Sequence, residues 1–233
     1  MKNKKKILLK ASILSVILLV LLISTGCAQK ELSKQEDLLN IDYKISGNET
    51  SLSTYDTENP VVALYVKNYG SIVIELYPTI APNTVANFVT LTKKGFYDGL
   101  TIHRVVPGFV IQGGDPDGNG TGGPGYTIRG EFKENGFPQN DITHDKGVIS
   151  MARASDPNSA GSQFFIVLDD STKMSLDNKY AGFGKVIEGM DVVEEIAKKA
   201  KIKDSNSGSL KKNIVISKVT VDTFGEEYKV KKH

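Results

Sequence analysis

Residues 102–115 read IHRVVPGFVIQGGD and place one arginine, Arg104, inside an otherwise apolar run. Burying a guanidinium among β-branched and aromatic side chains is costly unless the charge has a partner or a task. The valines favour strand, and Pro107-Gly108 interrupts the run with a tight turn or bulge. We therefore expect Arg104 and Gln112 to lie near each other on a rigid sheet edge, with Phe109 between them in sequence.

The rest of the chain predicts a barrel built from short strands. Apolar runs, several of them alternating, indicate further strands at 61–66, 71–77, 148–152, 163–168, 183–186 and 214–221. One helix opens at residues 81–83 and stops at Gly95, and a second covers 190–200. Residues 201–212 are polar and are expected to form a loop. Many short strands with two helices are typical of an antiparallel barrel capped by helices.

The bulk composition limits the kinds of partner. A chain of 233 residues fits one domain with appendages. Five lysines and no acids lie in residues 1–26, so removing them from the net charge of +2 leaves −3 for the rest. This mildly acidic body argues against nucleic acid as the main partner. A single cysteine excludes an intramolecular disulfide framework and a multi-cysteine metal site.

The N-terminus has the pattern of an export signal. Residues 1–10 are basic, and residues 7–23 are almost wholly apolar. The following Ser-Thr-Gly-Cys resembles the lipobox of bacterial lipoproteins, although Ser24 stands where an aliphatic residue is preferred. This resemblance implies a signal peptide at 1–26 and a diacylglyceryl-modified Cys27 that begins a flexible tether, residues 27–59. The alternative is an uncleaved signal anchor with a free cysteine, and both readings place the body outside the cytoplasmic membrane.

The glycine-rich segment and the histidines do not predict a metal site. Residues 113–125 hold seven glycines, and DPDGNG resembles the opening of a calcium loop. The twelfth position counted from Asp115 is Tyr126 rather than an acid, so a structural loop is favoured. His103 and His144 are too few for a confident metal site, and we expect structural roles for both. In a regular strand His103 points away from Arg104.

Three segments in order resemble the cyclophilin family of peptidyl-prolyl cis-trans isomerases: FYDGLTIHRVVPGFVIQGGD, ISMARASDPNSAGSQFFIVL and FGKVIEGMDVV. The resemblance covers residues 60–224 and leaves a basic tail, residues 225–233, that is expected to be disordered. It implies a mainly β fold, a closed eight-stranded antiparallel barrel capped by two α-helices. It also implies an isomerase that needs no cofactor or metal.

The resemblance assigns the site residue by residue. Its catalytic positions fall on Arg104, Phe109 and Gln112. Its substrate-binding positions fall on Val110, Ala152, Arg153, Gln163, Phe165, Leu176 and Tyr180. Val110 stands where methionine is common, and Arg153 where asparagine is usual. Ser175 replaces a tryptophan used to bind cyclosporin, and Tyr180 replaces a histidine at the pocket rim, so weak cyclosporin binding is expected.

Two functions from different classes fit these residues. The first is a monomeric, lipid-anchored isomerase that acts on proline-containing segments of exported proteins. The second is a chaperone or adhesion module that grips such segments with little turnover. Arg104 favours the first, because binding proline needs a pocket but no transition-state cation. A secreted hydrolase lacks an assembled nucleophile and base in the sequence pattern.

Overall fold

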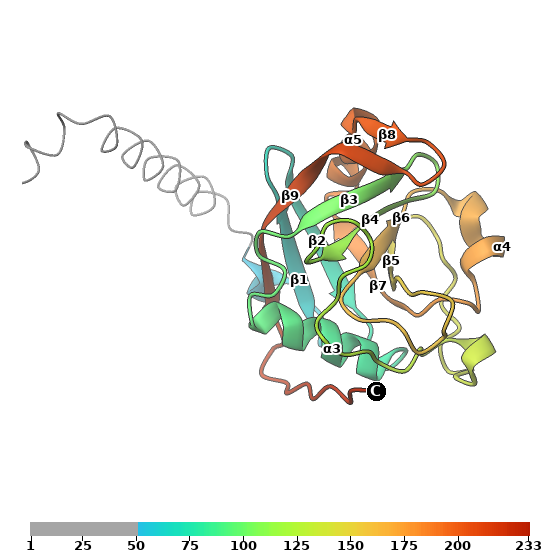
Figure 1. The fold of residues 1–233 in the computed structure, drawn as a ribbon. Coiled ribbons are helices and arrows are strands. Elements are labelled where there is room, and N and C mark those ends of the chain that lie inside the picture. The colour runs from blue at the N-terminus through green and yellow to red at the C-terminus, as the bar shows by residue number, and fades with distance from the viewer. Residues whose placement is uncertain (1–50) are drawn as a thin grey trace, which may run out of the picture. The chain divides into compact units, whose positions relative to one another are not determined.

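The computed structural model describes residues 51–233, so the predicted signal peptide, Cys27 and most of the predicted tether lie outside the described residues. Eight strands close into an antiparallel barrel in the order β1-β2-β7-β5-β6-β4-β3-β9, and β9 pairs back onto β1 (Figure 1). Their bounds are Val61–Val66 (β1), Gly70–Leu76 (β2), Thr101–Val106 (β3), Val110–Asp115 (β4), Val148–Met151 (β5), Phe164–Val167 (β6), Gly182–Glu188 (β7) and Ser209–Asp222 (β9). The predicted eight-stranded barrel is confirmed.

The first hairpin shows how local sequence sets the register. Asn68 and Gly70 both adopt positive φ, at 68° and 129°, which suits the turn between β1 and β2. All six residues of β1 are buried, because one face fills the barrel and the other is covered from outside. The outer cover includes Leu52 of the 3₁₀ turn η1 (Leu52–Thr54), so this part of the predicted tether packs on the barrel.

The two predicted helices lie at opposite ends of the barrel in Figure 1: α3 (Pro82–Lys93) across the lower end and α5 (Met190–Lys199) at the upper end. The four residues expected to form the buried stripe of α3 are all at most 4% exposed: Val85, Phe88, Val89 and Thr92. Phe88 contacts the rings of Tyr97, Phe164 and Phe183, with centroids 4.8 to 5.7 Å away. This aromatic cluster fixes α3 on the barrel.

Several short elements are absent from the sequence prediction. A one-turn helix, α4 (Lys173–Leu176), follows the 3₁₀ turn η3 (Asp170–Thr172), and another 3₁₀ turn, η2, covers Lys133–Asn135. The loop expected at residues 201–212 is wrong, because β8 (Ile202–Asp204) pairs there with the start of β9. Within residues 51–233, no helix has the length and apolar character needed to cross a membrane.

A buried carboxylate anchors the N-terminal end of α3. Glu131, 4% exposed, accepts hydrogen bonds from the backbone N–H groups of Asn83 and Thr84 at 3.0 and 2.7 Å, and from the Thr84 hydroxyl at 2.7 Å. The helix contributes no acidic residue to its own first turn. Glu131 therefore supplies the negative charge that a helix N-terminus favours, from a loop distant in sequence.

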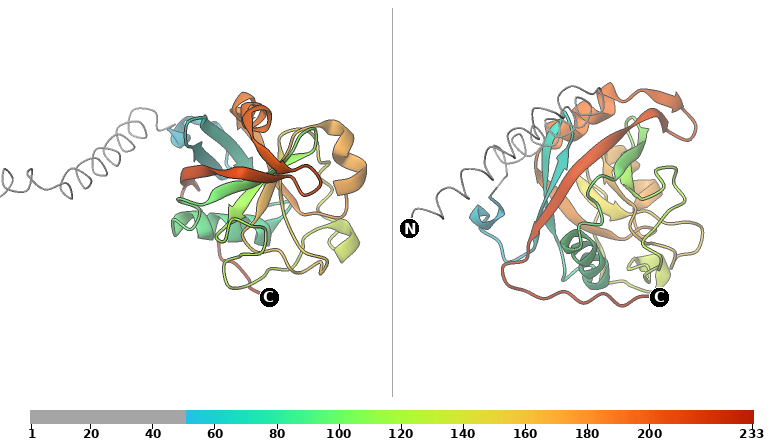
Figure 2. Two further views of the ribbon diagram at one scale, coloured as in Figure 1. Left: turned by 45° about the horizontal axis from the view of Figure 1, so that its top comes forward. Right: turned by 60° about the vertical axis from the view of Figure 1, so that its left-hand side comes forward.

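The basic tail is the clearest difference from the predicted domain plan. The sequence predicts disorder, but the C-terminal segment runs along the side of α3 (Figure 2). Asn83 and Lys231 exchange two hydrogen bonds, at 2.7 and 2.9 Å, and the His233 N–H donates to the Thr127 carbonyl at 2.8 Å. The Lys232 ammonium lies 4.3 Å from the centroid of the Tyr126 ring. A high lysine content predicts solvation, yet here backbone bonds and one cation–π contact hold the segment.

Deleting residues 231–233 should lower the free energy of unfolding by about 1–3 kcal/mol, because it removes three hydrogen bonds and the contact with Tyr126. Urea denaturation of the full-length chain and the truncated chain measures the difference. Lys229→Ala is the control, since Lys229 forms only an exposed 3.8 Å ion pair with Glu227. Identical urea midpoints for the parent and truncated chains would show that the tail adds no stability.

Candidate active site

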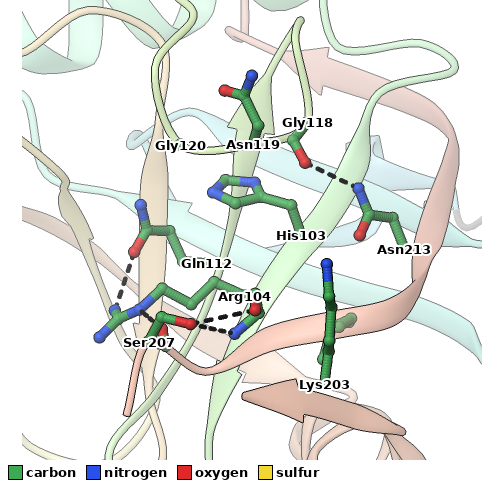
Figure 3. A pocket seen from close by; sticks show the side chains of 11 residues that line it. His103, Arg104, Gln112, Gly118, Asn119, Gly120, Lys203, Ser207 and Asn213 are labelled. Atoms are coloured by element: carbon green, nitrogen blue, oxygen red, sulfur yellow. Dashed lines mark hydrogen bonds between the residues drawn. The ribbon is translucent and has the colours of Figure 1, made fainter. Parts of the chain in front are cut away.

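The hairpin of β3 and β4 holds the predicted cation beside an amide. Arg104 and Gln112 are paired across the two strands, and the Arg104 Nη1 donates to Gln112 Oε1 at 3.0 Å (Figure 3). The Arg104 Nε donates to the backbone carbonyl of Ser207, in the β8–β9 turn, at 2.7 Å. No described residue accepts a hydrogen bond from Nη2. The guanidinium is therefore fixed in orientation while one terminal nitrogen stays available to a ligand.

A chain of amides extends from Arg104 to the glycine loop. Gln112 Nε2 donates to Gln163 Oε1 at 2.9 Å, and Gln163 Nε2 donates to the Gly122 carbonyl at 2.9 Å. Each amide thus has one defined orientation, because its oxygen accepts from one neighbour and its nitrogen donates to the next. Gln163 supports Gln112 in this arrangement.

One pocket of about 190 Å³ contains nine of the ten residues that the sequence assigns to the site. Its lining consists of Arg104, Phe109, Val110, Gln112, Ala152, Arg153, Phe165, Leu176 and Tyr180. Val110, Phe165 and Leu176 are buried and belong to one hydrophobic cluster under the pocket. The tenth residue, Gln163, contacts the group through Gln112. We call this the apolar pocket.

Tyr180 and Arg153 form one rim of the apolar pocket. The Tyr180 ring meets Phe165 edge-on, with centroids 5.6 Å apart and planes at 84°. The Arg153 guanidinium lies 4.8 Å from the Tyr180 ring centroid, and it donates through Nε and Nη2 to the Lys179 carbonyl at 3.1 and 2.9 Å. The donors of Arg153 are thus engaged within the protein, and its visible effect is to fix Tyr180.

The charge of Arg104 has no neighbouring carboxylate to offset it within the apolar pocket, whose lining includes no acid. Burial lowers the pKa of Arg104 from its ordinary value, and the nearby Tyr180 works in the opposite direction. A guanidinium nevertheless stays protonated throughout the working range of proteins. The site therefore offers a permanent, half-buried cation above an apolar cavity sized for a small ring.

The glycine loop is organised by the carboxylate of Asp115. This carboxylate, 1% exposed, accepts backbone hydrogen bonds from Asp117, Asn119 and Gly120. Burial alone would raise the pKa of Asp115, but these three donors outweigh it and the pKa lies below its usual value. Among residues 51–233, no group of three or more His, Cys, Asp or Glu side chains is arranged to hold a metal ion.

The structure also assembles a Ser–His–Asp line that the sequence pattern does not reveal. His144 Nδ1 lies 3.0 Å from Asp177 Oδ1, and its Nε2 lies 3.0 Å from the Ser150 hydroxyl. Both Ser150 and His144 are 0% exposed, and neither lines a described pocket, so this serine cannot reach a substrate. The His144 ring stacks on Phe165, with centroids 6.1 Å apart, and therefore supports the apolar pocket from beneath.

His103 differs from its predicted orientation. The pairing of β3 shifts register between Ile102 and Arg104, which is a β-bulge at His103. His103 and Arg104 consequently line the same second pocket instead of pointing to opposite faces, so the expectation that they diverge is wrong. This second pocket has no signal in the sequence, because its other walls come from the glycine loop and from a β8–β9 hairpin whose residues predict a loop.

Comparison with known proteins agrees with this geometry. Residues 61–221 match the family described as "Cyclophilin type peptidyl-prolyl cis-trans isomerase/CLD". The chain is 49% identical over 128 residues to peptidyl-prolyl cis-trans isomerase B of Bacillus subtilis, covering 55% of this chain and 84% of that protein. It is 43% identical over 156 residues to a Helicobacter pylori peptidyl-prolyl cis-trans isomerase, covering 66% and 86%.

A solved structure shows the same likeness. The Cryptosporidium parvum cyclophilin-type isomerase, crystallised in the presence of the dipeptide Ala-Pro, superposes with a TM-score of 0.61 at 32% identity, covering 70% of this chain and 98% of that one. The chain therefore belongs to the cyclophilin-type peptidyl-prolyl cis-trans isomerase family. The fold and enzyme class predicted from the sequence are confirmed.

Two buried histidines give the stability of the protein a defined pH dependence. Burial lowers the pKa of His144 despite Asp177, and it lowers the pKa of His103 despite Asp115. Below the unfolded pKa of about 6.5, the unfolded chain binds these protons and the folded chain does not. The free energy of unfolding should therefore be highest above about pH 7.5 and should fall as the pH drops toward 5. For the two histidines together, the loss is at most ~2.7 kcal/mol per pH unit.

Urea midpoints of the full-length chain at pH 8, 7, 6 and 5 measure this slope. His144→Asn should be less stable throughout and should show about half the slope, because one of the two groups is gone. A midpoint that rises on acidification from pH 8 to 6 would contradict the pKa directions given above.

Proposed function

We propose that this chain accelerates rotation about X-Pro bonds in exported proteins, with Arg104 stabilising the twisted amide. The observation that supports it is the position of the guanidinium, fixed by Gln112 and Ser207 at the edge of an apolar pocket with Nη2 unpaired among the described residues. A proline ring fits the apolar pocket, and the peptide nitrogen would then face the cation. Family membership supports the reaction class, and the role of each residue is our inference.

The reaction needs little more than these groups. The barrier is amide resonance, ~18–20 kcal/mol, which makes uncatalysed isomerisation take tens of seconds or longer. A 10⁴-fold acceleration corresponds to only ~5.5 kcal/mol of transition-state stabilisation. As the C–N bond rotates, conjugation is lost and the proline nitrogen becomes pyramidal and more basic. A hydrogen bond from Arg104 to that nitrogen strengthens in the transition state and contributes selectively there.

The other residues have binding and orienting roles in this proposal. Phe109, Phe165 and Leu176 enclose the ring, and Val110 closes the floor. Gln112 and Gln163 hold amide groups toward the substrate backbone, in orientations set by Arg104 and Gly122. Ala152 lies where the residues before proline would pass. No nucleophile or general base is required, which agrees with the burial of Ser150 and His144.

Arg104→Ala should reduce kcat/KM for an Ala-Pro tetrapeptide by ~10² or more, because it removes a preorganised donor aimed at developing charge. Arg104→Lys should recover only part of the loss, since an ammonium cannot keep the bonds to Gln112 and Ser207 in the same plane. The assay uses the full-length chain in mild detergent. Arg129→Ala is the matched control, because Arg129 is exposed and lines neither pocket.

Full turnover by folded Arg104→Ala would remove the arginine from the mechanism. A folded parent chain that binds proline peptides but turns none over would instead support the alternative, a binding chaperone or adhesion module.

We further propose that the protein is a lipoprotein on the extracytoplasmic face of the bacterial membrane. The support is the basic and apolar N-terminal pattern followed by Ser-Thr-Gly-Cys, which lies outside the described residues. Diacylglycerol on the Cys27 thiol would hold the domain at the membrane.

Ser175, exposed near the apolar pocket, cannot replace the indole contact of cyclosporin-binding relatives, so affinity for that ligand should be weak.

Cys27→Ser should abolish incorporation of radiolabelled palmitate in the producing bacterium and release the protein from the membrane fraction. The parent chain and Ser24→Leu, which restores the usual lipobox residue, should both be labelled. Labelling that persists in Cys27→Ser would disprove acylation at this cysteine.

A further inference from the structure

A second, larger pocket opens on the other side of the Arg104–Gln112 pair. Its volume is about 610 Å³, and it lies between the glycine loop and the β8–β9 hairpin (Figure 3). Eleven residues line it: His103, Arg104, Gln112, Gly118, Asn119, Gly120, Lys203, Ser207, Ser209, Leu210 and Asn213. We call it the polar pocket. Arg104 and Gln112 belong to both pockets, so they form a shared wall.

The lining of the polar pocket carries two cations and no acid. Arg104 presents one side of its guanidinium, and Lys203 rises from β8 with its ammonium toward Asn213 (Figure 3). Lys203 forms no ion pair with any of residues 51–233. Its neighbour in sequence, Asp204, already accepts hydrogen bonds from the Ser207 hydroxyl and the Asn206 N–H, at 2.8 and 3.0 Å. Asp204 keeps its negative charge and interacts electrostatically with Lys203, but the lining itself carries two cations and no acid.

His103 forms part of the wall of the polar pocket. It is 6% exposed, both of its ring nitrogens are buried, and the Thr101 backbone interacts with the ring. Figure 3 shows its ring between Gln112 and Asn119, facing the pocket. Because these nitrogens are buried, His103 shapes the wall of the pocket, and the charge offered to a ligand comes from Lys203 and Arg104.

Two other polar side chains near the pocket, Asp115 and Asn213, already have hydrogen-bond partners. Asp115 lies close to His103 but is absent from the lining, and its oxygens accept backbone bonds from Asp117, Asn119 and Gly120. Asn213 is similarly engaged, since its Nδ2 donates to the Gly118 carbonyl at 2.9 Å. The charged groups that the lining offers to a ligand are therefore Lys203 and the guanidinium of Arg104.

We propose that the polar pocket binds an acidic side chain, Asp or Glu, of the polypeptide whose proline occupies the apolar pocket. This inference rests on the proposed function. The wall shared by the two pockets limits the separation, because each residue of an extended chain adds only about 3.3 Å. The acidic residue therefore lies within about three residues of the proline.

The consequence is a preference among substrates. A carboxylate that pairs with the exposed Lys203 should improve kcat/KM about three- to fivefold over the isosteric amide. The preference should shrink at high ionic strength, because exposed charges are screened. A peptide without an acid should still be turned over, since the apolar pocket and Arg104 are unchanged.

A peptide series tests this. Tetrapeptides and longer peptides with one X-Pro bond carry Glu or Gln at each position from three before to three after the proline. We expect one position, or two adjacent ones, at which Glu exceeds Gln with the full-length chain. A Glu/Gln ratio of one at every position would overturn the inference.

Charge variants identify the residue responsible. Lys203→Gln should reduce the Glu/Gln ratio to near one while leaving turnover of an Ala-Pro reference peptide unchanged. Lys203→Glu should reverse the preference toward a lysine at the same position. Lys212→Gln is the matched control, because Lys212 is exposed on the same hairpin, carries the same charge and does not line the pocket. An equal loss in Lys212→Gln would indicate general attraction and contradict a specific pocket.

The reference peptide separates the two proposals. If the parent chain turns over no peptide, the proposed isomerase function fails. If it turns over the reference peptide and shows no acid preference, only the inference about the polar pocket fails.

Discussion

The site depends on a positive charge held in place by neutral groups. Arg104 is fixed by a side-chain amide and a backbone carbonyl, not by a carboxylate. A carboxylate partner would hold the guanidinium as firmly, but it would cancel the field that a twisted amide needs. Neutral acceptors orient the group and leave its charge to the substrate. Because the same side chain separates two pockets, this arrangement determines the electrostatics of both.

The glycine loop and the amide chain form one supporting unit. Gln163 reaches the Gly122 carbonyl, and a Cβ added at Gly122 would lie 2.2 Å from the Asp115 carboxylate. Any larger residue there would displace the carboxylate that organises the loop, and with it the carbonyl that orients Gln163. The orientation of Gln112 is thus determined several contacts away from the pocket, by packing too tight for a side chain.

The sequence predicts those features that arise from local pattern. The Arg104–Gln112 pairing follows from two strands joined by Pro107-Gly108, and the buried stripe of α3 follows from helical spacing. The bulge at His103 has no mark within β3 itself, because neither glycine nor proline lies in that strand. The residues of the β8–β9 hairpin are polar and therefore predict a loop. The lysines of the C-terminal tail predict a solvated segment. Contacts between distant segments, such as His144 with Asp177, arise only from the tertiary fold.

Closure of the barrel between its first and last strands has a kinetic consequence. β1 begins at Val61, while its partner β9 extends to Asp222, so one seam of the ring joins opposite ends of the domain. During synthesis from the N-terminus, this hydrogen-bonding edge of β1 remains unpaired until β9 has been made. Such high contact order slows folding and prolongs exposure of an open strand edge. The β1–β9 seam is therefore the part of the barrel that can form only after β9 has been made.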